Sequence, residues 1–101
     1  MTSYPIAAGA IAAHDKTLVA STVDTVTFTS QEVEQLKVWT DGTAAVYVSL
    51  DGSTPTVSGA HCFKIPAAAT AIAERFNVQQ LSPTIKLISA GTPVYSVSLA
   101  P

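Results

Sequence analysis

Short runs of β-branched residues recur along this chain, and turn signals separate them at intervals of about eight to twelve residues. Residues 25–29 show the pattern most clearly, because Val26 and Phe28 alternate with threonines. Strict alternation gives a strand one buried face and one solvated face. The spacing predicts an all-β protein, an antiparallel β-sandwich of about eight short strands, either immunoglobulin-like or jelly-roll-like.

The expected strands cover residues 16–23, 25–29, 35–40, 43–50, 61–65, 84–89 and 94–99. One further segment is open to two interpretations. The alanines of residues 67–71 favour the start of a helix by propensity. Over residues 72–78, the set Ile72, Glu74, Phe76 and Val78 alternates with the set Ala73, Arg75 and Asn77, which favours a strand.

The Asp41-Gly42 dipeptide predicts a two-residue hairpin turn between residues 35–40 and 43–50, because both turn positions need a positive φ. This turn would place Val38 opposite Ala45 and Leu36 opposite Tyr47, and a bulge would shift that register. Both faces of the predicted hairpin are largely apolar. Either the hairpin is central to the fold or another chain covers one face.

Residues 1–14 are predicted to form an extended N-terminal arm, and residues 15–101 a single β-sandwich domain. The arm is apolar, but no basic residue precedes it, so it lacks the charged start of a signal peptide. It is also too short to span a bilayer. It is either an arm that a neighbouring chain orders or a frayed terminus.

Charge is scarce in this sequence of 101 residues. Charged residues make up 12% of the chain, against about 25% in an ordinary domain. Such a surface suits either a protein packed against other chains or a sticky monomer. The five basic residues are scattered and the net charge is −2, so neither nucleic acid nor an anionic membrane is an expected partner. The single cysteine, Cys62, cannot form an internal disulfide, which favours folding in a reducing cytoplasm.

No residue pattern points to catalysis. His14-Asp15 could form part of a dyad, but no nucleophile motif accompanies it. His61 and Cys62 are adjacent and would point to opposite faces of a strand, so they cannot share a metal ion without a bulge. We expect a non-enzymatic protein with no metal and no cofactor.

Two groups of residues are candidates for contacts with a partner. One comes from the arm and the other from the predicted hairpin, where Trp39 and Tyr47 lie on opposite faces. An exposed aromatic side chain could anchor a protein or stack on a sugar; the alternative is that both are buried. The candidates are Tyr4, Pro5, Ile6, Ile11, Trp39 and Tyr47.

Three segments carry a resemblance to a known type of protein: VYVSLDGSTPTV at residues 46–57, IPA at 65–67 and IKLISAGTPVYSV at 85–97. Residues 38–99 resemble small virion proteins from the head gene clusters of tailed bacteriophages, through strand-and-turn patterns rather than a chemical motif. The resemblance implies a capsid decoration (cement) protein, made in the host cytoplasm and bound to the outer surface of the head. Its expected partners are the major capsid protein, or another virion protein, and copies of itself in a homotrimer.

In such a protein the N-terminal arm would clamp neighbouring capsid subunits. Deleting residues 1–13 would then abolish binding to the shell and leave the thermal stability of the fold nearly unchanged. Two other functions remain open. One is a structural component of the tail or the head closure, which would form rings, and the other is a small carbohydrate- or ligand-binding β module.

Overall fold

Strands make up the regular structure of this protein. The computed structural model describes residues 2–6, 12–29, 32–50, 52–57, 59, 62–81 and 83–100. Within these ranges there is no α-helix, which confirms the all-β prediction. Nine strands are described, rather than about eight: β1 Thr2–Ile6, β2 Ala12–Thr17, β3 Asp24–Phe28, β4 Glu32–Thr40, β5 Val46–Ser49, β6 Phe63–Ile65, β7 Ile72–Leu81, β8 Thr84–Ile88 and β9 Val94–Ala100.

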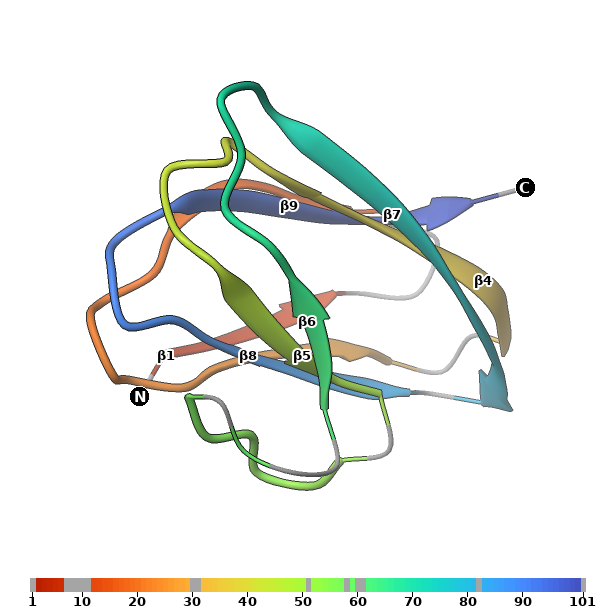
Figure 1. The fold of residues 1–101 in the computed structure, drawn as a ribbon. Coiled ribbons are helices and arrows are strands. Elements are labelled where there is room, and N and C mark those ends of the chain that lie inside the picture. Colours follow the sequence, from red (N-terminus) through yellow and green to blue (C-terminus); the bar gives the residue numbers. More distant parts are fainter. Residues whose placement is uncertain are drawn as a thin grey trace.

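The strands form two sheets that pack face to face (Figure 1). The five-stranded sheet has the order β1-β3-β8-β5-β6, and the four-stranded sheet has the order β2-β9-β4-β7. Four antiparallel pairs are nested in the chain: β5 with β6, β4 with β7, β3 with β8, and β2 with β9. A long hairpin rolled into two sheets in this way is a jelly roll. The strand order therefore decides between the two sandwich types that the sequence left open.

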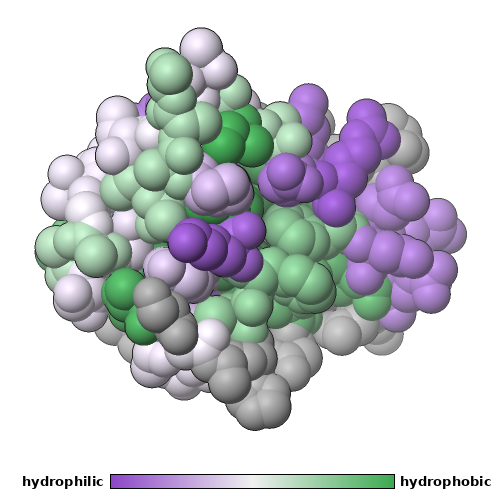
Figure 2. Space-filling view, viewed as in Figure 1, coloured by the Kyte–Doolittle hydropathy of each residue, from purple (hydrophilic) through white to green (hydrophobic). Residues whose placement is uncertain are grey.

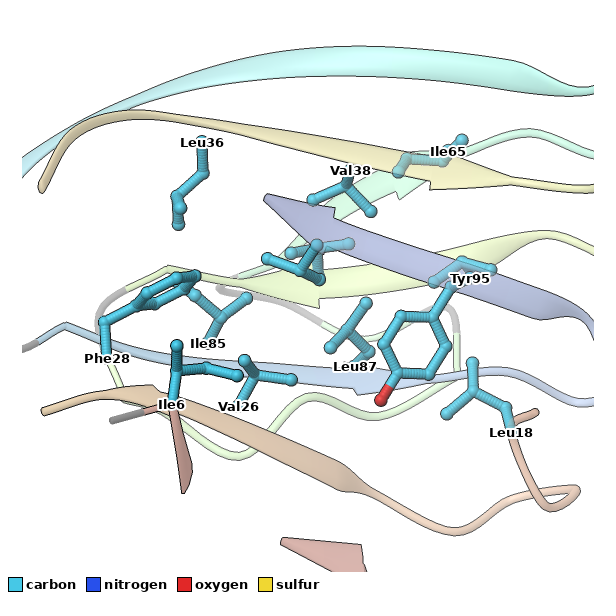
Figure 3. Packing of buried hydrophobic residues seen from close by; sticks show 13 residues of the cluster. Ile6, Leu18, Val26, Phe28, Leu36, Val38, Ile65, Ile85, Leu87 and Tyr95 are labelled. Atoms are coloured by element: carbon cyan, nitrogen blue, oxygen red, sulfur yellow. The ribbon is translucent and has the colours of Figure 1, made fainter. Parts of the chain in front are cut away.

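The core lies between the sheets and follows the period-2 alternation of the strands. In β3, Val26 and Phe28 are fully buried while Thr25 and Thr27 are half-buried, as the alternation predicts. Figure 3 shows side chains of both sheets meeting in this space. The buried cluster comprises Ile6, Leu18, Val26, Phe28, Leu36, Val38, Val46, Val48, Ile65, Ile85, Leu87, Tyr95 and Val97.

The N-terminal segment does not form an arm outside the sandwich where the structure describes it. Residues Thr2–Ile6 form β1, which pairs in parallel with β3, and Ile6 is only 6% exposed within the core. Residues Ala12–Thr17 form β2, which pairs with β9 in the other sheet. The prediction of an arm over residues 1–14 is wrong for these two strands, because each completes a sheet edge with backbone hydrogen bonds.

Asp41-Gly42 does not close a hairpin, so the predicted pairing of Val38 with Ala45 is wrong. It joins two sheets, since β4 belongs to the four-stranded sheet and β5 to the five-stranded one. The Asp41 N–H donates to the Val94 carbonyl, and the Val94 N–H donates to Asp41 Oδ2. The Gly42 carbonyl accepts from the Ala68 N–H. These bonds to distant segments hold the chain at the corner, where only Gly42 has a positive φ, +80°.

The ambiguous segment over residues 67–78 is resolved in favour of a strand. No helix forms over residues 67–71, and β7 begins at Ile72, where the alternation starts. The first predicted strand, residues 16–23, is largely wrong, because β2 covers Ala12–Thr17 and only residues 16 and 17 lie in both. A turn follows it, with Ser21 at a φ of +56° and the Thr22 N–H donating to the Val19 carbonyl.

Candidate functional site

The contact residues predicted in the N-terminal segment do not form one exposed group. Pro5 is exposed, Tyr4 is half-buried against the core, and Ile6 is buried. Ile11 lies outside the described residues. Because Ile6 packs into the core of its own chain, it has no free surface for a partner in this structure.

The two aromatic candidates on β4 and β5 are not close in the sheets. Trp39 is half-buried and pairs with Ser96 and Ala73, so it lies on the outer face of the four-stranded sheet. Tyr47 is only 7% exposed. It lies on the outer face of the five-stranded sheet, because its neighbours Val46 and Val48 belong to the core. Figure 1 shows the segment that follows β5 on this same outer side, and Pro55 within it is buried. The interpretation of Tyr47 as an exposed anchor is therefore not supported.

Two side-chain contacts link the sheets on the side of β1 and β2: one joins these two edge strands, and the other joins the strands next to them, β3 and β9. The Lys16 Nζ lies 4.7 Å from the centroid of the Tyr4 ring, a cation–π contact from β2 to β1. Deeper in the core, the Tyr95 hydroxyl donates a 2.9 Å hydrogen bond to Asp24 Oδ2. Burial, followed by the nearby Asp24 charge, raises the pKa of Tyr95 well above its ordinary value. The strands β1 and β2, with the contact between Tyr4 and Lys16, form one edge of the sandwich. It is called the closed edge below.

The opposite edge of the sandwich, formed by β6 and β7, is open and apolar. Phe63 and Phe76 meet there with ring centroids 5.2 Å apart and a tilt of 48°, yet Phe63 remains 55% exposed. Ile72 and Val78 are partly buried beside them, and the charged Glu74 is exposed. These five residues define the open edge. Figure 2 shows hydrophobic side chains at the surface in the middle of this view, with hydrophilic ones gathered to the right.

The backbone of β7 adds a second property to the open edge. This ten-residue strand pairs with β4 on one side, and no described strand pairs with its other side. An edge strand presents backbone N–H and C=O groups that another chain can pair with. A bulge interrupts β7 where Val78 and Gln79 oppose one residue of β4, and Gln79 has a φ of +48°. The regular part available to a partner is therefore Ile72 to Asn77.

Sequence reasoning missed the open edge. Phe63 and Phe76 fall within the segments 61–65 and 72–78, and aromatic side chains on strands usually belong to the core. A signal was present in the sequence: Phe63 stands in a run that Pro66 cuts short, which is typical of a short edge strand.

The described residues hold no group of three or more histidine, cysteine, aspartate or glutamate side chains that could bind a metal ion. The Cys62 thiol points to the Gly59 carbonyl at 3.4 Å. His61 lies outside the described residues, as does the side chain of His14. No helix in the described part of the chain is long and apolar enough to cross a membrane.

The fold and its two contrasting edges define a small jelly-roll β-sandwich, a class compatible with a structural or binding module. No protein-family model matches the chain, and no curated protein sequence matches it. Among solved structures, it is similar to PliG, a periplasmic inhibitor of g-type lysozyme from Aeromonas hydrophila. The TM-score is 0.58, with 10% sequence identity over 98% of each chain. At that identity the likeness shows a shared fold.

Two further structures are more distant. The pre-peptidase C-terminal domain of a collagenase from Bacillus anthracis aligns with a TM-score of 0.49 and 12% identity, over 97% of this chain and 94% of that one. The coat protein of Tobacco streak virus aligns with a TM-score of 0.45 and 12% identity, over 88% of this chain and 83% of that one.

Proposed function

We propose that this chain is a structural virion protein of a tailed bacteriophage, a capsid decoration protein that binds the outer surface of the head and stabilises it. The observation that carries the proposal is the open edge, where the 55% exposed Phe63 contacts Phe76 on β7, a strand with one side that no described strand pairs with. The resemblance of residues 38–99 to small head proteins supplies the biological context.

The open edge has the composition of a protein-contact surface. Interfaces are enriched in aromatic side chains and depleted of charge at their centre, with a polar rim. Phe63 and Phe76 would supply such a centre, and Lys64 and Glu74, both exposed, would belong to the rim. The low charge of the chain, 12% of its residues, reduces the charge that such a contact would have to desolvate.

The mechanism requires no reaction. A protein that binds the assembled shell and not its separated subunits stabilises the shell by mass action. Many copies on one shell, each bound weakly, hold the lattice through multivalency. The jelly roll itself is used in viral capsids, but also in lectin domains and cupins, so the fold alone does not select this function.

The test is co-sedimentation of the purified protein with mature heads of a tailed phage that carries this sequence, followed by thermal disruption of the decorated heads. Saturable binding and a higher disruption temperature are expected. Binding to isolated tails instead of heads would replace the proposal with a tail or head-closure role. Binding to neither would refute a virion role.

A matched pair of variants links the result to the open edge. Phe63→Ser removes its exposed ring, and Val19→Ser changes an apolar residue of similar exposure, 57%, that stands after β2. Loss of head binding by the first variant alone would identify the open edge as the contact surface. Equal loss by both would mean that general surface hydrophobicity, and not this edge, drives the binding.

A further inference from the structure

We propose that the open edge of one copy pairs with the closed edge of a second copy, so that β2 of the second copy continues the four-stranded sheet beyond β7. The proposal rests on the proposed function only in taking the open edge as a protein-contact surface. It assigns to the second copy the side of β7 that no described strand pairs with, whereas Phe63 lies on β6 of the other sheet and remains the residue tested for head binding.

The strand directions permit this pairing. The sheet order is β2-β9-β4-β7, and each neighbouring pair within it is antiparallel. The two edge strands of the sheet therefore run in opposite directions. A second copy placed in the same orientation presents its β2 to β7 as an antiparallel neighbour.

The faces and charges also match. Lys16 pairs with the buried Tyr95, and Glu74 pairs with the buried Val38, so both lie at inner-face positions of their strands. In an antiparallel register that places Lys16 of the second copy opposite Glu74, two opposite charges meet on one face. Opposite charges in such cross-strand pairs are stabilising.

The same register pairs the next positions without conflict. Thr17 of the second copy would oppose Ala73, and both are exposed outer-face positions. A self-pairing of β7 about a two-fold axis has no such match, because centring it at Glu74 or at Arg75 brings like charges together.

The bulges explain why the pairing is confined to a few residues. His14 and Asp15 together oppose a single residue of β9, and Asp15 has a φ of +54°. A bulge also stands at Gln79 on β7. Bulges at both edges restrict sheet extension to one short register. This head-to-tail contact joins two different edges, so repeated copies close into a ring if the rotation between them permits.

The first experiment measures self-association without capsids, by light scattering after size-exclusion chromatography over a range of concentrations. We expect the wild-type chain to associate, and Glu74→Lys or Lys16→Glu to weaken association by about tenfold or more, as like charges replace a pair. The double variant K16E/E74K should recover most of the affinity. Glu34→Lys, the same change at another exposed glutamate, should behave as wild type.

A wild-type chain that is monomeric at every concentration would overturn the inference, as would a double variant that fails to recover. Cross-linking gives an independent readout in a Cys62→Ser background. Thr17→Cys combined with Ala73→Cys should form disulfide-linked oligomers on oxidation, because antiparallel partners bring Cβ atoms to within about 5.5 Å. Linked dimers from Ala73→Cys alone would instead indicate β7 self-pairing and would overturn it.

The two proposals fail separately. A protein that associates through these residues but binds no heads refutes the decoration role and leaves the pairing intact. A protein that binds heads as a monomer, with Glu74→Lys binding equally well, refutes the pairing alone.

Discussion

The Tyr95 hydroxyl and the Asp24 carboxylate are joined across the core by a 2.9 Å hydrogen bond, and their residues are 0% and 1% exposed. Tyr95 belongs to β9 and Asp24 to β3, so the bond links the two sheets. Removing one partner of a buried pair leaves the other with an unmet desolvation cost. The bond therefore ties the packing of the sandwich to the protonation of the Tyr95 hydroxyl.

Tyr95→Phe should lower the free energy of unfolding at pH 7 by about 1.5–3 kcal/mol, because the bond involves a charged acceptor. Urea denaturation measures the change. A loss below about 0.5 kcal/mol, the range of a surface substitution, would mean that the hydroxyl contributes little to stability.

The same residue predicts an alkaline effect. The pKa of Tyr95 is raised in the folded state, so the neutral phenol stabilises the fold fully below the ordinary tyrosine pKa of about 10. Stability should fall as the pH rises above that value, because the unfolded state then releases the proton first. Thermal melts between pH 8 and pH 11 should show a shallower decline for Tyr95→Phe than for wild type.

Asp41 predicts an acid effect of the opposite sign. Burial tends to raise the pKa of this carboxyl, but hydrogen bonds from the Thr43 hydroxyl and from the N–H groups of Thr43 and Val94 leave it lowered. The ionised Asp41 carboxylate contributes fully to the stability of the fold above the ordinary pKa of about 3.9. This contribution is lost as the pH falls through the lowered pKa. Asp41→Asn should lower stability at pH 7 by about 1 kcal/mol.

Thermal melts between pH 2 and pH 7 check this prediction. The Asp41→Asn variant should lose less stability on acidification than the wild type. If the two proteins lose equal stability on acidification, other carboxyl groups are responsible for the pH dependence of stability.

Alanine substitutions at two glycines can separate two effects on the free energy of unfolding: that of a close contact and that of a positive φ. Gly42 and Gly52 have φ values of +80° and +84°. A Cβ at Gly42 would lie 2.5 Å from the Thr70 carbonyl oxygen, whereas a Cβ at Gly52 would meet nothing within 4 Å. Gly52→Ala should cost about 1–2 kcal/mol from the left-handed conformation alone.

Gly42→Ala should lower the free energy of unfolding clearly more than Gly52→Ala, because the backbone must move at the corner between the sheets. Denaturant unfolding of both variants measures the difference. Equal costs would mean that residues 68–70 give way freely, and the corner would then be less rigid than the bonds to Ala68 and Val94 indicate.

The placement of β1 predicts that the N-terminal segment stabilises the fold. Ile6→Ala should lower the free energy of unfolding by about 2–4 kcal/mol, since Ile6 is buried in the core. Pro5→Ala, at an exposed position of the same strand, should change it by less than about 1 kcal/mol. If both variants unfold at the same temperature as the wild type, the N-terminal segment is loosely held in solution, as a frayed terminus would be.

Local alternation predicted most strands correctly, because the period of residues 25–29 or 72–78 reports which face is buried whatever the partner strand is. Alternation does not show which strands pair with each other. Asp41-Gly42 has the chemistry of a hairpin turn, but bonds to Val94 and Ala68, both distant in the sequence, hold the chain at a corner instead. The open edge could not be predicted for a similar reason. The exposure of Phe63 depends on which strands lie at the ends of the sheets, and the topology of the whole chain determines that.

The nested pairing of the strands also has a consequence for synthesis. The outermost antiparallel pair sets Ala12 opposite Ser98, so the four-stranded sheet cannot be completed until β9 has been made. Pairing of such distant segments is slow, because a large loop must close before any contact rewards it. Until β8 and β9 have left the ribosome, β3 and β4 lack these neighbouring strands. The sandwich is therefore expected to form in a single late step, once β9 is available to pair with β2 and β4.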